Sequence, residues 1–396
     1  MVRVAYLVSH PIQYQAPLLR LLAQQPDFSL KVLFGANTAA GIRDPGFGTD
    51  IKWDVPLLQG YEHEFLPALA GGALTSVRPL NFGIGRRLKR GGYDVLWIHG
   101  YTRLSHILAI VAAKRRGIKV MVRDEAHGAN VRESGPRERA RRAFYAFLTR
   151  MADAFLAIGT LNHDYYRRIG VPETRIFSVP YAVDNSFFRE RATAAAHRRE
   201  ELRRELCLAP ERPIVLFAGK LIQRKGVMTL LHAYSRLSSD RRSEPEPCLL
   251  FAGDGQQRSA IEEFAAASGW KSIRVLGFRN QTELPALYDL CDLFVLPSLY
   301  EPWGLVVNEV MNAGKAVIVS DRVGCGPDLV KPGINGAIFP AGDAQALAAA
   351  MAALLRDRNT LFCMGKRSLE IIGHWSFNED LMGIRAALAY LASSAS

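Results

Sequence analysis

The amino-acid sequence predicts an α/β protein of two domains, each built on a doubly wound parallel sheet. Short runs rich in β-branched residues alternate with helical patterns along the whole chain, as they do in repeated βαβ units. The 396 residues are too many for one ordinary hydrophobic core and suit two domains of typical size. Two such sheets in series are expected to face each other across a cleft at the carboxyl ends of their strands, where ligands usually bind.

Twelve strands are expected, each a short and mainly aliphatic run that ends in a glycine, a proline or a polar residue. Those of the first half span residues 3–9, 30–35, 94–100, 118–124, 154–159 and 175–180. Those of the second half span residues 213–219, 248–254, 272–277, 293–298, 316–321 and 335–340. Between them, apolar residues recur at helical spacing, as in 226–238 and 344–357.

The junction between the domains is expected within residues 181–206, where extended chain gives way to a polar helix rich in Ala, Arg and Glu. We therefore predict an N-terminal domain over 1–185 and a C-terminal domain over 186–375. A last helix, in 376–396, is expected to return to the N-terminal domain.

Composition narrows the class of protein. With 49% hydrophobic and 22% charged residues, the chain is typical of globular proteins. No apolar stretch approaches the roughly 18 uncharged residues of a membrane span, and the first ten residues suit a strand better than a signal peptide. The five cysteines are widely spread, odd in number and without a CxxC pair, which predicts a reduced, cytoplasmic protein without a zinc site.

The positive charge is confined to the first half. Residues 1–200 hold 29 Lys and Arg against 17 Asp and Glu, whereas residues 201–396 hold 21 of each kind. Residues 101–150 alone hold 12 basic and 4 acidic residues, many of them in the amphipathic pattern that follows Gly135. A basic half suits nucleic acid, an anionic membrane or a phosphorylated ligand, and composition does not choose among these.

Two carboxylates lie in the segment LPSLYEPWGLVVNEVMNAG. A strand ends near Ser298, Glu301 follows in the loop, and a helix is expected to start around Gly304 and to stop at Gly314. The helix start presents free backbone N–H groups and the positive end of the dipole to an anion, and Gly304 allows a close approach. Glu309 lies among apolar residues of that helix, where a carboxylate is costly unless it is hydrogen-bonded or reaches a ligand. The Glu309 carboxylate could equally well pair with a buried hydrogen-bond donor of the protein or with a ligand.

Two cations leave a second strand end. In VLFAGKLIQRKG, a strand and the glycine Gly219 precede Lys220 and Lys225, which could neutralise a diphosphate without a metal. A solvated basic loop is the alternative for this segment alone. The strand-end glycine Gly253 begins a GxG sequence, which by itself mainly indicates a tight turn.

Together these segments resemble the retaining glycosyltransferases of family four, which have the two-Rossmann GT-B fold. The resemblance covers almost all of residues 205–375 and rests on AGKLIQRKG, FAGDG, LGF, AVIVSD, GINGAIFPAGD and, most specifically, on Glu301 and Glu309 spaced as E-x7-E around Pro302, Trp303 and Gly304.

The resemblance implies a role for each matching residue. Glu309 would accept the ribose hydroxyls of a nucleotide sugar such as a UDP- or GDP-sugar, and Glu301 would meet the hydroxyls of the donor sugar. The backbone at Gly304 and Leu305 would hold the β-phosphate, with Lys220 and Lys225 beside the diphosphate. Lys220 replaces the arginine that is commoner in the family and would act as a point charge rather than a bidentate fork. The base would lie near Phe278 and Arg279.

The N-terminal half departs further from the family. The first strand ends in SHPIQYQAP rather than in a glycine-rich loop, which places His10 near the expected cleft. Where many members have a histidine at a strand end, this sequence has Asp124, and the nearest histidine is His127. His127 could contact the donor sugar, Asp124 or Glu125 could replace it, or His127 could be an exposed loop residue. His99 is also expected to point toward the cleft.

Together with the charged residues, the resemblance implies a metal-independent, retaining hexosyltransferase-type enzyme that needs no further cofactor. Its acceptor would be a glycan, a lipid-linked or another hydroxyl compound, in surface glycan or glycoconjugate synthesis. The basic half could also give peripheral contact with the inner face of an anionic membrane. The alternatives are a nucleotide-sugar epimerase or a sugar-phosphate synthase of the same fold. A nucleic-acid-binding protein is less consistent with the sequence, which has no recognisable nucleic-acid module.

Overall fold

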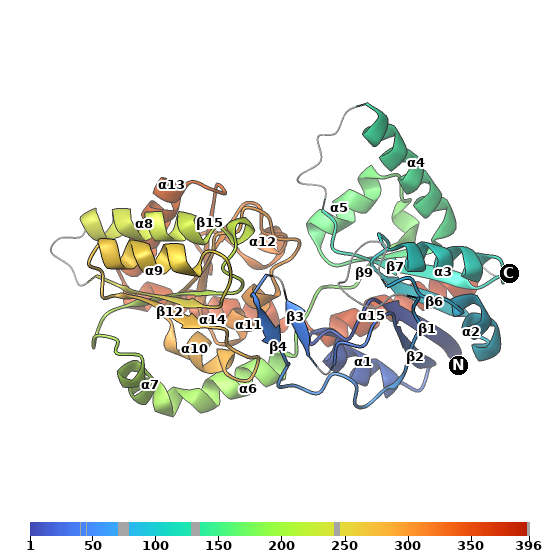
Figure 1. Ribbon diagram of the computed structural model, residues 1–396, viewed down its shortest axis with the longest axis horizontal. Helices are drawn as coiled ribbons and strands as arrows, with labels where there is room; N and C mark the ends of the chain where they lie inside the picture. The colour runs from blue at the N-terminus through green and yellow to red at the C-terminus, as the bar shows by residue number, and fades with distance from the viewer. Residues whose placement is uncertain (40, 45, 70–78, 128–134, 241–245, 394–396) are drawn as a thin grey trace. The chain divides into compact units, whose positions relative to one another are not determined.

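The computed structural model describes residues 1–39, 41–44, 46–69, 79–127, 135–240 and 246–393 (Figure 1). The chain divides into two compact units. Unit 1 comprises Met1–Gly41, Pro56–Tyr181 and Phe377–Ser396, and unit 2 comprises Ile42–Val55 and Ala182–Ser376.

Unit 1 contains a seven-stranded parallel sheet in the order β5-β2-β1-β6-β7-β8-β9. Its strands are β1 (Val2–Val8), β2 (Phe28–Phe34), β5 (Glu62–Phe65), β6 (Val95–His99), β7 (Lys119–Arg123), β8 (Ala154–Ala157) and β9 (Ile176–Ser178). Its helices are α1 (Gln15–Ala23), α2 (Ile84–Gly91), α3 (Leu104–Lys114), α4 (Pro136–Met151), α5 (Thr160–Arg168) and α15 (Phe377–Ser393).

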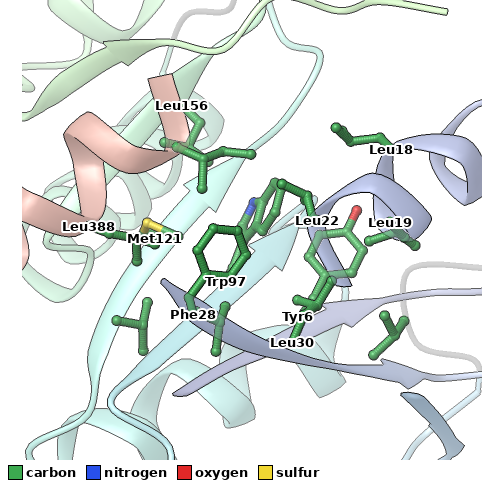
Figure 2. Packing of buried hydrophobic residues seen from close by; sticks show 14 of the residues in the cluster. Tyr6, Leu18, Leu19, Leu22, Phe28, Leu30, Trp97, Met121, Leu156 and Leu388 are labelled. Carbon is green, nitrogen blue, oxygen red and sulfur yellow. The ribbon is translucent and has the colours of Figure 1, made fainter. Parts of the chain in front are cut away.

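The central strand β1 shows why helices cover both faces of this sheet. Successive side chains of a strand point to opposite faces, and here both sets are apolar and buried. Tyr6 packs with Leu22 of α1 and Leu388 of α15 in one core (Figure 2), whereas Leu7 packs with Leu88 and Ile110 of α2 and α3 in the other.

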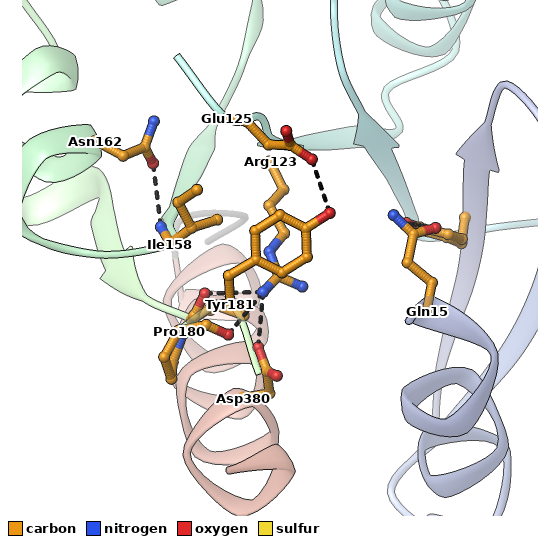
Figure 3. A network of polar contacts seen from close by, with 10 residues as sticks. Gln15, Arg123, Glu125, Ile158, Asn162, Pro180, Tyr181 and Asp380 are labelled. Atoms are coloured by element: carbon orange, nitrogen blue, oxygen red, sulfur yellow. Dashed lines mark hydrogen bonds and ion pairs between the residues drawn. The ribbon is translucent and has the colours of Figure 1, made fainter. Parts of the chain in front are cut away.

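The last helix, α15, is fixed to unit 1 by a buried ion pair. Arg123, at the end of β7, donates to the Asp380 carboxylate at 3.0 Å and to the carbonyls of Val179 and Pro180 at 3.0 and 2.8 Å (Figure 3). The two charged side chains are only 3% and 1% exposed. Removing one partner would leave the other charge buried and uncompensated.

Unit 2 contains a six-stranded parallel sheet in the order β12-β11-β10-β13-β14-β15. Its strands are β10 (Ile214–Ala218), β11 (Cys248–Ala252), β12 (Ile273–Gly277), β13 (Leu293–Leu296), β14 (Ala316–Ser320) and β15 (Gly336–Phe339). Its α-helices are α6 (Asn185–Ala195), α7 (Arg199–Glu205), α8 (Val227–Asp240), α9 (Arg258–Ala267), α10 (Leu284–Leu290), α11 (Leu305–Asn312), α12 (Gly326–Leu329), α13 (Ala344–Leu355) and α14 (Arg358–Gly373). Its short 3-10 turns are η2 (Ala196–Arg198) and η3 (Gln223–Lys225), whereas η1 (Glu173–Arg175) lies in unit 1.

The twelve predicted strands are all present, and the two doubly wound sheets confirm the predicted fold class. Three strands had no counterpart in the sequence prediction. Strand β5 has the polar sequence EHEF at the sheet edge, and β3 (Ile42–Asp44) pairs with β4 (Thr49–Ile51) as a two-stranded antiparallel hairpin.

The two compact units differ from the predicted domains in where the hairpin belongs. Contacts group Ile42–Val55 with unit 2, whereas the sequence prediction kept it inside the domain 1–185. The first unit otherwise ends at Tyr181, and Phe377 begins the segment that returns to it.

Within the described part of the chain, no helix is both long and apolar enough to cross a membrane.

Gly383 lets α15 approach β9 closely. A Cβ atom at Gly383 would lie 1.9 Å from the carbonyl oxygen of Ser178. We predict that Gly383→Ala displaces the helix and lowers the free energy of unfolding by about 1–3 kcal/mol. The matched control is Gly373→Ala at the end of α14, where an added Cβ meets no atom within 4 Å. Urea denaturation of both variants measures the effect, and equal stabilities would show that α15 tolerates the extra atom.

Candidate active site

The first part of the candidate site is the start of α11. Gly304 precedes this helix with φ of 99°, in the left-handed region that favours glycine. A Cβ atom there would also lie 3.1 Å from side-chain atoms of Leu296 and Val323. Leu305 is the first helical residue, and the backbone N–H groups of this first turn lack helical partners, as at any helix start.

Glu309 is a buried carboxylate inside α11. Only 5% of the residue is exposed, and the hydroxyl of Tyr288 in α10 donates to its Oε2 atom at 2.5 Å. Burial raises the pKa of Glu309 to about 7, although the hydrogen bond from Tyr288 opposes this shift. The helix therefore tolerates Glu309 partly because the carboxyl group has a buried donor, one of the two partners considered from the sequence.

Glu301 forms an ion pair with Lys225. The Lys225 ammonium donates to Oε2 of Glu301, and the two side chains are 13% and 11% exposed. The Ser298 hydroxyl donates to the same oxygen at 3.3 Å. The structure thus joins a cation predicted for the diphosphate to the carboxylate predicted for the donor sugar.

The backbone of the Glu301 loop is held by the loop that follows β14. The amide of Glu301 donates to the Arg322 carbonyl at 3.0 Å, and the amide of Gly324 donates back to the Glu301 carbonyl at 3.0 Å. A Cβ atom at Gly324 would lie 1.9 Å from the Pro302 carbonyl, so only glycine permits this approach. These contacts hold the backbone of the loop from which the Glu301 side chain extends.

The basic turn after β10 is packed against the neighbouring strand ends. A Cβ atom at Gly253 would lie 1.8 Å from the Gly219 carbonyl oxygen, and one at Gly226 would lie 2.1 Å from the Pro297 carbonyl oxygen. The two glycines therefore do more than mark turns, since each allows one strand-end loop to touch another. Lys220 lies with its ammonium nitrogen 5.2 Å from the ring centre of Phe47, in cation–π contact.

The predicted base site has aromatic neighbours. Phe278 meets the rings of Phe47 and Trp53 at centroid distances of 5.1 and 6.2 Å, with interplanar angles of 81° and 63°. Arg279 is half-buried and donates to Glu283 at 3.1 Å. Neither aromatic neighbour lies parallel on Phe278 as a stacked nucleobase would.

The N-terminal candidates lie on unit 1. Asp124 is 8% exposed and accepts hydrogen bonds from the Tyr166 hydroxyl at 2.7 Å and from Asn162 at 3.4 Å. Burial raises the pKa of Asp124 against the effect of these donors. The carboxylate thereby ties the end of β7 to α5, which favours a structural role over contact with a donor sugar.

The histidines of unit 1 differ in burial. His127 is 3% exposed, so the alternative of an exposed loop histidine is wrong. Nδ1 of His10 lies 2.8 Å from the Ser9 hydroxyl, and both residues are partly buried at the end of β1. His99 packs edge-on against Tyr6 and Tyr181, and burial lowers its pKa to about 3, so this ring is neutral at physiological pH.

Three residues of the candidate site on unit 2 were not predicted from the sequence. Tyr288 is a buried aromatic at a core position of α10, and its partner Glu309 lies 21 residues away, so only the tertiary fold pairs them. Phe47 and Trp53 belong to the hairpin that was not predicted. Its one signal is the turn sequence PGFG, which by itself says nothing about a site.

Comparison with known proteins defines the class. The family model for the glycosyl transferase 4-like domain matches residues 34–182, and the model for glycosyl transferases group 1 matches residues 198–369. These matches include both units and cover most of the chain. The fold is that of the GT-B glycosyltransferases, and the two matched segments, which together make up most of the chain, are glycosyltransferase domains.

Solved structures show the same fold. Alr3699/HepE of Anabaena, in complex with UDP and glucose, matches with a TM-score of 0.74 and 18% identity over 98% of this chain and 100% of that chain. Sucrose-phosphate synthase from Thermosynechococcus elongatus matches with a TM-score of 0.72 and 20% identity over the whole of both chains.

Curated relatives are more similar in sequence over shorter segments. Alpha-D-kanosaminyltransferase of Streptomyces kanamyceticus is 31% identical over 52% of this chain and 52% of the relative. D-inositol 3-phosphate glycosyltransferase of Corynebacterium efficiens is 31% identical over 62% of this chain and 58% of the relative. The chain spans between 33% and 64% of the length of the first relatives that it matches.

The raised pKa of Glu309 predicts a pH-dependent stability. Between its unfolded pKa of about 4.3 and its folded pKa of about 7, the folded protein binds more protons, so this group's contribution to stability falls as pH rises through that window. We predict that Glu309→Gln, which cannot ionise, gains about 3 kcal/mol relative to the wild type between pH 4 and pH 8. Calorimetric unfolding of both proteins across this range tests the prediction. A difference in Tm that does not change with pH would mean that Glu309 keeps an ordinary pKa.

Proposed function

We propose that the protein transfers a sugar from a nucleotide-sugar donor to a hydroxyl acceptor, with retention of anomeric configuration and without a metal ion. The observation that carries this proposal is the contact of Lys225 with Glu301, which joins the glycine turn that also bears Lys220 to the loop that leads into the helix of Glu309. The match to glycosyltransferase domains gives this contact its chemical interpretation.

In this proposal Glu309 receives the ribose hydroxyls of the donor. These hydroxyls would donate hydrogen bonds to the Glu309 carboxyl group, of which Oε2 already accepts a hydrogen bond from the Tyr288 hydroxyl. A carboxylate is the better acceptor, so donor binding should favour the ionised form and release a proton near neutral pH. The buried position ensures that this contact is made in a site of low dielectric constant, where it is strong.

In the proposal Lys225 binds the diphosphate of the donor and Glu301 binds its sugar. An incoming diphosphate would attract the Lys225 ammonium, and this would leave the Glu301 carboxylate to accept hydrogen bonds from the donor sugar. As the bond between the anomeric carbon and the phosphate oxygen breaks, negative charge grows on the departing diphosphate. Lys220, Lys225 and the N–H groups at the start of α11 would stabilise that charge.

We propose metal independence because the same cations would supply the positive charge that a divalent ion provides. Among the described residues, no three His, Cys, Asp or Glu side chains are grouped so as to hold a metal. A uridine nucleotide is the first donor class to test, because solved structures of the related fold were determined with UDP and with UDP-glucose.

We also propose that α4 brings the enzyme to an anionic membrane surface on the cytoplasmic side, where a lipid-linked acceptor would be found. Leu148 is the one buried side chain of this helix among its described residues, and Arg137, Arg139, Arg142 and Arg150 are exposed. Each cation near such a surface contributes about 1 kcal/mol to binding. Four arginines could therefore give reversible docking.

Substitution of the two carboxylates tests the proposed chemistry. With a nucleotide sugar found by a binding screen, we predict that Glu309→Ala weakens donor binding by about tenfold or more, because the ribose loses its acceptor. Glu301→Ala should reduce kcat by more than it raises KM. Calorimetry and donor-hydrolysis rates measure the two effects, and activity should persist in excess EDTA. Unchanged kinetics in both variants, or an absolute need for a divalent ion, would contradict the proposal.

Charge reversal on α4 tests the membrane proposal. The triple variant Arg137→Glu, Arg139→Glu, Arg142→Glu should lose sedimentation with anionic liposomes at low salt, whereas the wild type should sediment with them and not with neutral ones. The control reverses three exposed arginines of unit 2, Arg204, Arg356 and Arg367. Equal recovery of all proteins in the supernatant would leave only a soluble acceptor.

A further inference from the structure

The hairpin Ile42–Val55 belongs to unit 2 although it is encoded far from the rest of that unit. The chain leaves unit 1 after Gly41 and returns to it at Pro56. Between these points β3 and β4 pair in the register Ile42↔Ile51 and Asp44↔Thr49. The hairpin thus adds two strands to unit 2, outside its six-stranded sheet.

The segment after β4 anchors the hairpin to the loop between β12 and α10. Asn280 donates from its side-chain amide to the Lys52 carbonyl at 2.8 Å and accepts from the Asp54 amide at 3.4 Å. The Asp54 carboxylate in turn accepts from the Thr282 amide at 3.1 Å and from the Thr282 hydroxyl. Ile51 is 2% exposed and adds an apolar contact. The anchor combines hydrogen bonds in both directions with burial, so it fixes the hairpin in one place.

The turn of the hairpin lies on residues assigned to the nucleotide. The Phe47 ring contacts the Lys220 ammonium at 5.2 Å and the Phe278 ring at 5.1 Å. The Gly46 carbonyl oxygen approaches Gly255 so closely that a Cβ atom there would lie 2.8 Å from it. One half-buried aromatic side chain therefore connects a cation of the diphosphate site with the aromatic residue of the base site.

We propose that Phe47 is a further nucleotide-binding residue, which forms an aromatic wall of the nucleoside site and positions the Lys220 ammonium for the diphosphate. The inference deepens the proposed function and rests on it. An aromatic ring favours a nearby cation on its face and offers an apolar surface to a base at its edge. Both kinds of contact are useful for a nucleoside diphosphate, which carries its charge and its aromatic ring at opposite ends.

Trp53 and the anchor hold Phe47 in this position. The Trp53 ring meets the same Phe278 ring at 6.2 Å, one residue before the anchoring Asp54. If the hairpin instead covered the site as a plug, the nucleotide would have to displace Phe47, and its removal would strengthen binding. The two possibilities differ in the sign of one measured quantity, the change in affinity.

The experiment is calorimetric titration of the full-length protein with UDP and with GDP. We expect Phe47→Ala to weaken binding of the preferred nucleotide by roughly tenfold, and Phe47→Leu to weaken it less, because leucine keeps apolar surface but offers no π face. Asp54→Ala should weaken binding through release of the anchor, and the effects of Phe47→Ala and Asp54→Ala together should be less than multiplicative.

The control is Phe362→Ala on α14. Phe362 is 63% exposed and has the same kind of cation–π contact, with the Lys366 ammonium 4.5 Å from its ring centre. This variant should bind as the wild type does. Unchanged or tighter binding by both Phe47 variants would overturn the inference, and tighter binding would establish a plug.

Glu309→Ala separates this inference from the proposed function. If Glu309→Ala loses binding while the Phe47 variants keep it, the nucleotide site stands and only the role of Phe47 is wrong. If the wild type binds neither nucleotide, the proposed function is wrong as well. The Tm of each variant, measured without nucleotide, shows whether the variant is folded. If Phe47→Ala does not fold, the affinity of Phe47→Leu for the nucleotide tests the proposal instead.

Discussion

The ion pair between Lys225 and Glu301 is the contact on which the candidate site depends. It joins the turn after β10 to the loop after β13, and both partners are largely buried. A buried charge without its partner typically costs about 3–5 kcal/mol, so each residue makes the other tolerable in the absence of ligand. The pair therefore keeps two opposite charges buried together at the place where the donor is proposed to bind. There, Lys225 would interact with the diphosphate and Glu301 with the sugar hydroxyls.

Close contacts between backbones make this pairing possible. Gly226 lies against Pro297, Gly253 against Gly219, and Gly324 against Pro302 at distances that leave no room for a side chain. The carboxyl ends of parallel strands meet at one edge of a sheet, and glycines at these positions bring their loops into direct contact. The loops of the candidate site thus pack main chain against main chain, and the charged side chains extend from these packed loops.

The sequence predicted the sheets better than the contacts of the site. Buried parallel strands such as β10 and β14 are continuous apolar runs, which local pattern identifies. The edge strand β5 has no such pattern, and the hairpin strands are three residues each. Glu301, Glu309 and Lys225 were predicted as site residues from spacing and family resemblance, but the contacts that they make were not predicted. The pairs Glu309 with Tyr288, Lys220 with Phe47 and Asp124 with Tyr166 join distant segments, so they depend on tertiary structure.

The hairpin also imposes an order on synthesis. Asp54 is translated 228 residues before its partner Thr282. At a ribosomal rate of about 5–20 residues per second, the segment Ile42–Val55 waits roughly 10–45 s before the surface that anchors it exists. Unit 1 also lacks α15 until Phe377–Ser393 has been translated, which comes after the whole of unit 2. Neither unit can be completed in the order of the chain, and the nascent protein must keep an aromatic hairpin from making wrong contacts until unit 2 has been made.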